Sequence, residues 1–150
     1  FPFFGAERRG APVKAFARLS EKPILIRSQV YNPDYVIVLD ATLLQVIDVT
    51  EGLKKDGIII VNATKKPKEL NLKGYRVATV DATGIALELK LLVAGLPVLN
   101  TPMLGAFAGA TGEVKLETVL ETIREEWPGA IGEKNAEGAA LAHKRLVKGW

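Results

Sequence analysis

Cysteine is absent from this sequence of 150 residues, and histidine occurs once. Without a thiolate, the chain alone forms no disulfide, ligates no iron–sulfur cluster and offers neither a cysteine nucleophile nor a cysteine-ligated zinc site. The single histidine, His143, lies in a predicted helix beside Lys144 and Arg145, which favours a surface position over a general base. The sequence therefore favours a binding or assembly domain over an enzyme that works alone.

Candidate metal ligands are also sparse. Asp40, Asp81 and Glu88 could gather as magnesium ligands, but their spacing matches no metal-binding loop. Helix caps and solvated helix faces account for such residues more simply. We predict no metal site in this chain and assign it no catalytic residue.

Long hydrophobic runs are missing too. A membrane-spanning helix needs about 20 apolar residues, whereas the apolar stretch around residues 85–97 is interrupted by Glu88 and Lys90. No signal-peptide pattern is present, and a chain without cysteine suits a reducing cell interior. We therefore predict a soluble, cytoplasmic protein with no membrane partner.

The length and the pattern of residues predict the fold. Hydrophobic residues make up 48% and charged residues 25% of the chain, which predicts one globular domain over residues 1–150. Strands are predicted at 14–19, 24–28, 35–39, 58–61 and 76–80, and a short strand or an extended link at 98–100. Helices are predicted at 42–53, at 85–93, from 101, at 115–126 and at 133–146. The run 35–39 lacks polar alternation, which is typical of a strand buried on both faces. Strands alternating with helices predict an α/β fold: a Rossmann-like, doubly wound, mostly parallel sheet with helices on both faces, an N-terminal β-hairpin (14–28) and a helical C-terminus.

Polar residues follow the predicted strands at their carboxyl ends, which is where ligands bind in doubly wound parallel sheets. Threonine stands beside Asp or Asn in four segments, 40–42, 61–64, 80–84 and 99–102. These residue types are ordinary N-caps of the helices that come next. The same helix N-termini point N–H groups at one edge of the sheet and could hold a phosphate or a carboxylate. Both interpretations remain open at this point.

The positive charge of the chain is concentrated near its start. The formal net charge is +3, and residues 1–30 alone carry +4. Within that segment Arg8 and Arg9 lie between glycines in a turn-rich loop, where their planar guanidinium groups could bind a phosphate or carboxylate bidentately. The alternative is a solvated basic turn in which Glu7 pairs with an arginine.

Two common ligand classes are disfavoured. A nucleic-acid surface usually interleaves basic and aromatic residues, but the first aromatics, Phe1, Phe3 and Phe4, all precede the arginines. A glycine fingerprint for a dinucleotide does not follow the first predicted strand, and Gly105 and Gly109 fall inside a helical pattern, where small residues permit close helix packing.

Four blocks of the sequence resemble a known family. They are Phe1–Val13 (FPFFGAERRGAPV), Pro33–Val38 (PDYVIV), Asp81–Ala86 (DATGIA) and Asn100–Ala106 (NTPMLGA), and the closing Gly132–Asn135 (GEKN) also matches. In this order they resemble the gamma subunit of pyruvate:ferredoxin oxidoreductase and of its relatives that act on branched 2-oxoacids. The resemblance spans nearly the whole chain.

The resemblance implies a subunit of a hetero-oligomeric enzyme. That enzyme oxidatively decarboxylates a 2-oxoacid with coenzyme A and gives acyl-coenzyme A, carbon dioxide and reduced ferredoxin. Its thiamine diphosphate, Mg²⁺ and [4Fe-4S] clusters would belong to partner subunits, with alpha, beta and delta subunits and ferredoxin as the partners. Pyruvate and branched 2-oxoacids are not distinguished, and a non-catalytic α/β assembly or ligand-binding domain is the alternative function.

The resemblance also suggests roles for particular residues. Members of the family begin with a strand, a glycine-rich turn and a helix, so we expect such a unit to be missing before Phe1. Glu7, Arg8 and Arg9 are the candidates for binding the phosphates of coenzyme A, with Glu7 holding a guanidinium group in place. A further set, which could border the same cleft or a subunit interface, consists of Asn100, Thr101 and Met103.

Overall fold

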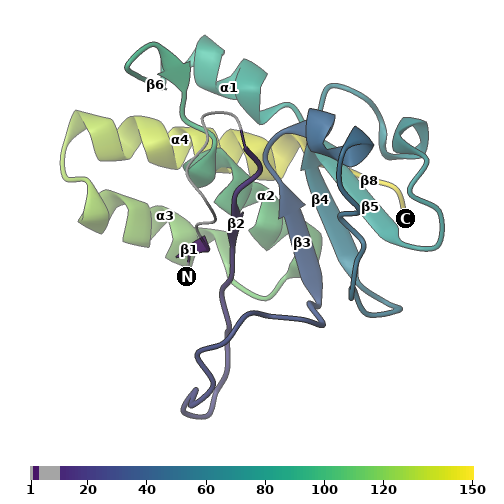
Figure 1. Ribbon diagram of the computed structural model, residues 1–150. Helices are drawn as coiled ribbons and strands as arrows, with labels where there is room; N and C mark the ends of the chain where they lie inside the picture. Colours follow the sequence, from purple (N-terminus) through teal and green to yellow (C-terminus); the bar gives the residue numbers. More distant parts are fainter. Residues whose placement is uncertain (1, 4–10) are drawn as a thin grey trace.

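A four-stranded sheet in the order β3-β4-β5-β8 forms the centre of the protein (Figure 1). The structure is a computed structural model that describes residues 2–3 and 11–150. Strands β3 (Tyr35–Val38), β4 (Ile58–Asn62) and β5 (Arg76–Val80) are parallel, and β8 (Val147–Lys148) runs antiparallel to β5. The predicted strands at 35–39, 58–61 and 76–80 and the mostly parallel α/β sheet are confirmed.

Both faces of the sheet are covered, but by different kinds of helix. Ile58, Ile60 and Val80 pack with side chains of α1 (Ala82–Glu88), α2 (Asn100–Thr111) and α4 (Ala130–Arg145). Ile59, Val61 and their neighbours face the short 3₁₀ helices η1 (Ala41–Gln45) and η2 (Pro67–Leu70) and adjoining loops. Figure 1 shows the α-helices on one side of the sheet, and α3 (Leu116–Glu126) packs beside α2 and α4. The helix predicted at 42–53 is thus a shorter 3₁₀ helix.

The sheet is most deeply buried at β4, not at β3. Every residue of β4 is buried, because β4 has a paired strand on each side and both of its faces are covered. The prediction that 35–39 is buried on both faces is wrong: β3 lies at the end of the described sheet, and Ile37 is 40% exposed. Strong β-propensity identifies the strand, but it does not say which strand has two neighbours.

The predicted hairpin of 14–19 and 24–28 is wrong. Only β2 (Lys14–Ala15) is a strand in that region, and it pairs antiparallel with β1 (Pro2–Phe3). A two-stranded hairpin without a sheet or helix to pack on is marginal in water. Residues 16–31 instead form an extended arm outside the helices and strands.

The segment after β5 also differs from the prediction. Helix α1 ends at Glu88, and the apolar residues that looked like its last turn form a small hairpin of β6 (Leu92–Val93) and β7 (Leu96–Pro97). Its two-residue turn, Ala94–Gly95, has positive φ at both positions (50° and 77°), as a type I′ hairpin turn requires. Of the two alternatives for 98–100, the strand is not formed: residues 98 and 99 are a link outside the helices and strands, and Asn100 begins α2.

The C-terminus differs from the predicted helical end, because α4 is followed by a strand. The helices predicted at 115–126 and 133–146 are present as α3 and α4, but β8 follows α4 and pairs with β5. This places the end of α4 next to the carboxyl end of the sheet. In the described part of the chain, no helix is both long and apolar enough to span a membrane.

Candidate functional site

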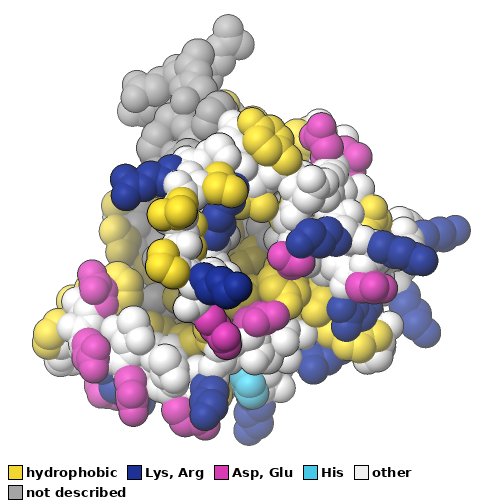
Figure 2. All heavy atoms as spheres, turned by 90° about the horizontal axis from the view of Figure 1, so that it is seen from below, with side chains coloured by type: hydrophobic (Ala, Val, Ile, Leu, Met, Phe, Trp, Pro, Cys, Tyr) yellow, Lys and Arg dark blue, Asp and Glu magenta, His cyan; other side chains and the backbone are white. Residues whose placement is uncertain are grey.

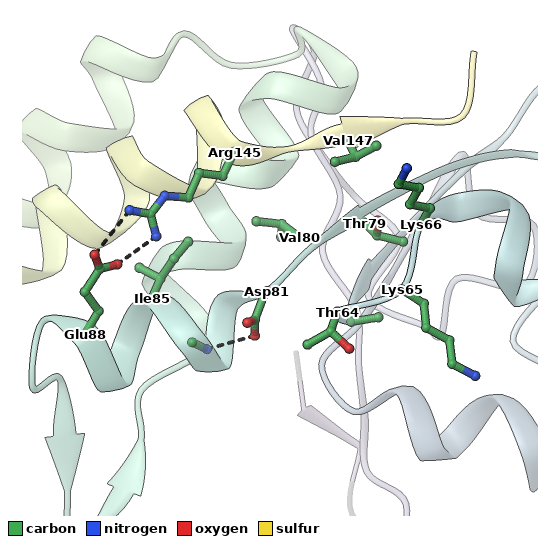
Figure 3. A pocket seen from close by; sticks show the side chains of 12 residues that line it. Thr64, Lys65, Lys66, Thr79, Val80, Asp81, Ile85, Glu88, Arg145 and Val147 are labelled. Atoms are coloured by element: carbon green, nitrogen blue, oxygen red, sulfur yellow. Dashed lines mark hydrogen bonds and ion pairs between the residues drawn. The ribbon is translucent and has the colours of Figure 1, made fainter.

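A cleft of about 470 Å³ lies where β4 and β5 end (Figure 3). We call it the β4–β5 cleft. Its walls come from the loop after β4, from the end of β5 and from α1, with α4 and β8 on the far side. The lining residues are Ala63, Thr64, Lys65, Lys66, Thr79, Val80, Asp81, Gly84, Ile85, Glu88, Arg145 and Val147. Two of the predicted polar segments, 61–64 and 80–84, therefore do meet at one edge of the sheet.

Asn62 joins the segments that form this edge. Its Nδ2 donates to the carbonyl of Leu39 (3.0 Å) and to Oγ1 of Thr83 (2.9 Å). Its Oδ1 accepts from the backbone N–H of Ala82 (2.9 Å) and of Thr83 (3.3 Å). One amide, 8% exposed, thus links the ends of β3 and β4 to the first turn of α1.

The first N–H groups of α1 are already satisfied by side chains. Asn62 accepts from the first two, and Asp81 Oδ1 accepts from the N–H of Gly84 (2.8 Å). Asp40 caps η1 in the same way, and the hydrogen bonds from the hydroxyl and the N–H of Thr42 lower the pKa of its carboxyl. The capping interpretation is confirmed for Asp40 and Asp81. These N–H groups are therefore not free donors for a phosphate.

An ion pair forms one wall of the cleft. Arg145 of α4 donates from Nη1 to Oε2 of Glu88 (2.7 Å) and from Nη2 to Oε1 (3.3 Å). The hydrogen bonds and then the charge of Arg145 lower the pKa of the Glu88 carboxyl, and the same contacts raise the pKa of Arg145. Figure 3 shows this pair on the α1 side, with Lys65 and Lys66 on the opposite side.

Both carboxylates that line the cleft already accept hydrogen bonds from groups in its walls. Glu88 is held by Arg145, and Asp81 accepts from the backbone of α1. The uncommitted charged groups of the cleft are the ammonium groups of Lys65 and Lys66, for which no ion pair is found among the described residues. The arrangement therefore suits a polar or anionic ligand, bound by contacts with lysine.

Two of the predicted cleft or interface residues lie inside the protein. Thr101 is 1% exposed, and its hydroxyl donates to Oδ1 of Asn135 in α4 (2.7 Å). Met103 is 2% exposed and belongs to the core between the sheet and the helices. Asn100, by contrast, is exposed at the start of α2, where no side chain caps the helix. The structure thus brings Asn100 to the surface and gives the other two packing roles.

The other predicted candidates are not gathered into a site. Glu7, Arg8 and Arg9 lie outside the described residues. Within the described residues, no group of three or more His, Asp or Glu side chains could hold a metal ion. Asp81 and Glu88 line the β4–β5 cleft, whereas Asp40 caps η1.

His143 is half-buried on α4 and faces α2. A Cβ added at Gly109 of α2 would lie 3.2 Å from Cδ2 of His143. The imidazole therefore packs against α2 at a glycine, which has no side chain. This position fits a helix contact.

The wall formed by α4 could not be predicted from the sequence. Glu88 and Arg145 are 57 residues apart, and no local pattern signals that they pair. Lys65 and Lys66 follow the segment 61–64, and their sequence carries no motif that indicates a site. The only sequence signal for this cleft is the general rule that ligands bind beyond the carboxyl ends of parallel strands.

The family whose model matches the chain is described as pyruvate ferredoxin/flavodoxin oxidoreductase, and the match covers residues 1–144. Among similar proteins, a pyruvate synthase subunit PorC from Methanocaldococcus jannaschii is 53% identical over 99% of this chain and 79% of its own length. A pyruvate/ketoisovalerate oxidoreductases common subunit gamma from Thermococcus kodakarensis is 56% identical over 98% of this chain and 80% of its own length.

A solved structure has the same fold. The pyruvate oxidoreductase subunit PORC from Thermotoga maritima superposes with a TM-score of 0.70 at 32% sequence identity. The match covers 81% of this chain and 67% of that one. The similarity in sequence and the similarity in structure therefore point to one family.

Proposed function

This chain belongs to the pyruvate ferredoxin/flavodoxin oxidoreductase family, and we propose that it helps to bind coenzyme A as the gamma subunit of its enzyme. That enzyme is a 2-oxoacid:ferredoxin oxidoreductase. The observation that carries the assignment is the identity of 53% and 56% to two such subunits along almost the whole chain. The reaction we propose for the complex converts a 2-oxoacid and coenzyme A to acyl-coenzyme A, carbon dioxide and reduced ferredoxin.

The iron–sulfur chemistry of that reaction does not fit the residues of this chain. An iron–sulfur cluster needs cysteine thiolates, and the sequence has none. We assign thiamine diphosphate and Mg²⁺ to partner subunits on the resemblance of this chain to gamma subunits of the family. We therefore propose that alpha, beta and delta subunits carry thiamine diphosphate, Mg²⁺ and the [4Fe-4S] clusters.

We further propose that Arg8 and Arg9 bind the phosphates of coenzyme A, with Glu7 orienting one guanidinium group. Support comes from the sequence: residues 1–30 carry a net charge of +4, and the two arginines stand between glycines. Guanidinium groups bind phosphate oxygens bidentately, which lysine cannot do. The cationic segment would also raise the local concentration of an anionic co-substrate.

Kinetics of the assembled enzyme test this role. Replacing both residues (Arg8→Ala/Arg9→Ala) should raise the KM for coenzyme A at least about 10-fold, because two charge-assisted hydrogen-bonding groups are lost. The kcat should stay near the wild-type value, since the arginines contact the co-substrate away from the reacting thiol.

The matched control removes two other cations. Lys65→Ala/Lys66→Ala takes the same charge from the β4–β5 cleft, and we expect it to leave the KM for coenzyme A within about 2-fold of wild type. An unchanged KM in the arginine variant would contradict the proposal. A larger effect in the lysine variant would instead assign the phosphates to the β4–β5 cleft.

An assembly-only subunit is the second candidate function. The observation that favours it is the number of large hydrophobic side chains exposed on this chain, Leu25 and Ile26 among them. If the arginine variant assembles poorly but the assembled fraction keeps its normal KM for coenzyme A, this candidate is the correct one.

Under the main proposal, residues 1–150 act as one gamma-type domain of a cytoplasmic complex. Asn100 remains our candidate for a contact at the surface of this domain.

A further inference from the structure

Residues 16–31 form an arm that leaves the protein after β2 and returns before β3 (Figure 1, lowest part). None of these residues, all of which the structure describes, belongs to a helix or strand. Nη2 of Arg18 donates to the carbonyls of Ser28 (3.2 Å) and Gln29 (3.0 Å), which ties the two legs of the arm together. The arm thus has a defined course without a core of its own.

The arm exposes large hydrophobic side chains. Leu25 is 87% exposed and Ile26 is 64% exposed, and Leu19, Ile24 and Tyr31 are exposed as well. Single exposed hydrophobic residues are normal, but a cluster of them marks an interaction site. Figure 2, seen from below, shows hydrophobic and cationic side chains gathered over the arm, which faces the viewer.

The charge of the arm indicates the kind of surface that it fits. Arg18, Lys22 and Arg27 outnumber the one acid, Glu21. The complementary surface is a groove with an apolar floor and an acidic rim. A twofold contact between two copies through this arm would instead bring like charges together.

We propose that the arm docks this subunit onto another subunit of its oxidoreductase, in an apolar groove with an acidic rim. This proposal rests on the proposed function, because it takes the complex as given. Leu25 and Ile26 are the anchors, and Lys22 and Arg27 steer the approach. The hydrogen bonds of Arg18 join the two legs at the base of the arm before binding, which lessens the order that has to be gained on docking.

The test measures binding of the full chain to the complex formed by the other subunits of its own enzyme. Leu25→Ser/Ile26→Ser should weaken this binding at least about 100-fold, as expected when two central anchors of an interface are lost. The matched control, Val46→Ser/Ile131→Ser, replaces two exposed aliphatic residues outside the arm. The affinity of this control variant for the other subunits should stay within about 3-fold of the wild-type affinity.

Two further measurements separate docking from folding. The arm variant should melt within about 2 °C of wild type, because its changed side chains are already exposed. Lys22→Glu/Arg27→Glu should slow association about 10-fold at low salt, and the difference should shrink as salt is added.

Three results would overturn the proposal. They are unchanged binding of the anchor variant, equal weakening by the control, and a dimer of the isolated chain that the anchor variant abolishes. Failure of the wild-type chain to bind the other subunits at all would overturn the proposed function itself, so the two failures are distinguishable.

Discussion

Gly105→Ala should unfold the protein at a markedly lower temperature than wild type. A Cβ at this position would lie 1.9 Å from the carbonyl oxygen of Ala139, so α2 and α4 approach at Gly105 as closely as their backbones allow. Backbone cannot move aside as a flexible side chain does, and the two helices must separate. We expect a loss of about 3 kcal/mol of stability or more, which corresponds to a fall of about 6–12 °C in the melting temperature.

The control for this prediction lies one turn along the same helix. A Cβ at Gly109 would lie 3.2 Å from side-chain atoms of His143 and Leu146, which can shift. Gly109→Ala also gains up to about 1 kcal/mol in helix propensity, so its melting temperature should stay within about 3 °C of wild type. Equal stability of the two variants in thermal unfolding would show that the close approach is not needed.

Asn62→Ala should be the most damaging change at the β4–β5 cleft. It removes four hydrogen bonds and leaves the N–H of Ala82, a residue with no exposed surface, without an acceptor. An unsatisfied buried donor costs about 1–3 kcal/mol, and the lost bonds add to it, so the free energy of unfolding should fall by about 3 kcal/mol in a urea titration.

Asn32→Ala provides the comparison for Asn62. The Asn32 side chain donates a single hydrogen bond, to the carbonyl of Gly52 (3.2 Å), at an exposed position. Its loss should cost less than about 1 kcal/mol. If both variants lost the same small amount, the role of Asn62 in joining the two strand ends to α1 would be refuted.

The parallel strands could be predicted because their signal is local. Residues 58–61 and 76–80 are rich in β-branched residues, and burial between two neighbours agrees with that composition. Because 61–64 and 80–84 follow such strands, they are expected at one edge of the sheet, and residues of both segments line the β4–β5 cleft. Its ligand-binding role stays a prediction.

The remaining errors come from interactions between distant residues. Strand β8 has two residues, and it exists because it pairs with β5, about 70 residues earlier. The Glu88–Arg145 ion pair likewise joins residues that are 57 positions apart in the sequence. The false hairpin arose because Leu25 and Ile26 suggest a strand, whereas no sheet of the described chain takes them up.

The most direct test of the account is an anaerobic assay of the purified complex with and without this chain. Coenzyme A-dependent reduction of a low-potential acceptor would be measured with pyruvate and with branched 2-oxoacids. The account predicts that activity disappears when the chain is left out and returns when it is added back. Full activity without the chain would contradict its assignment as a required subunit of the 2-oxoacid:ferredoxin oxidoreductase.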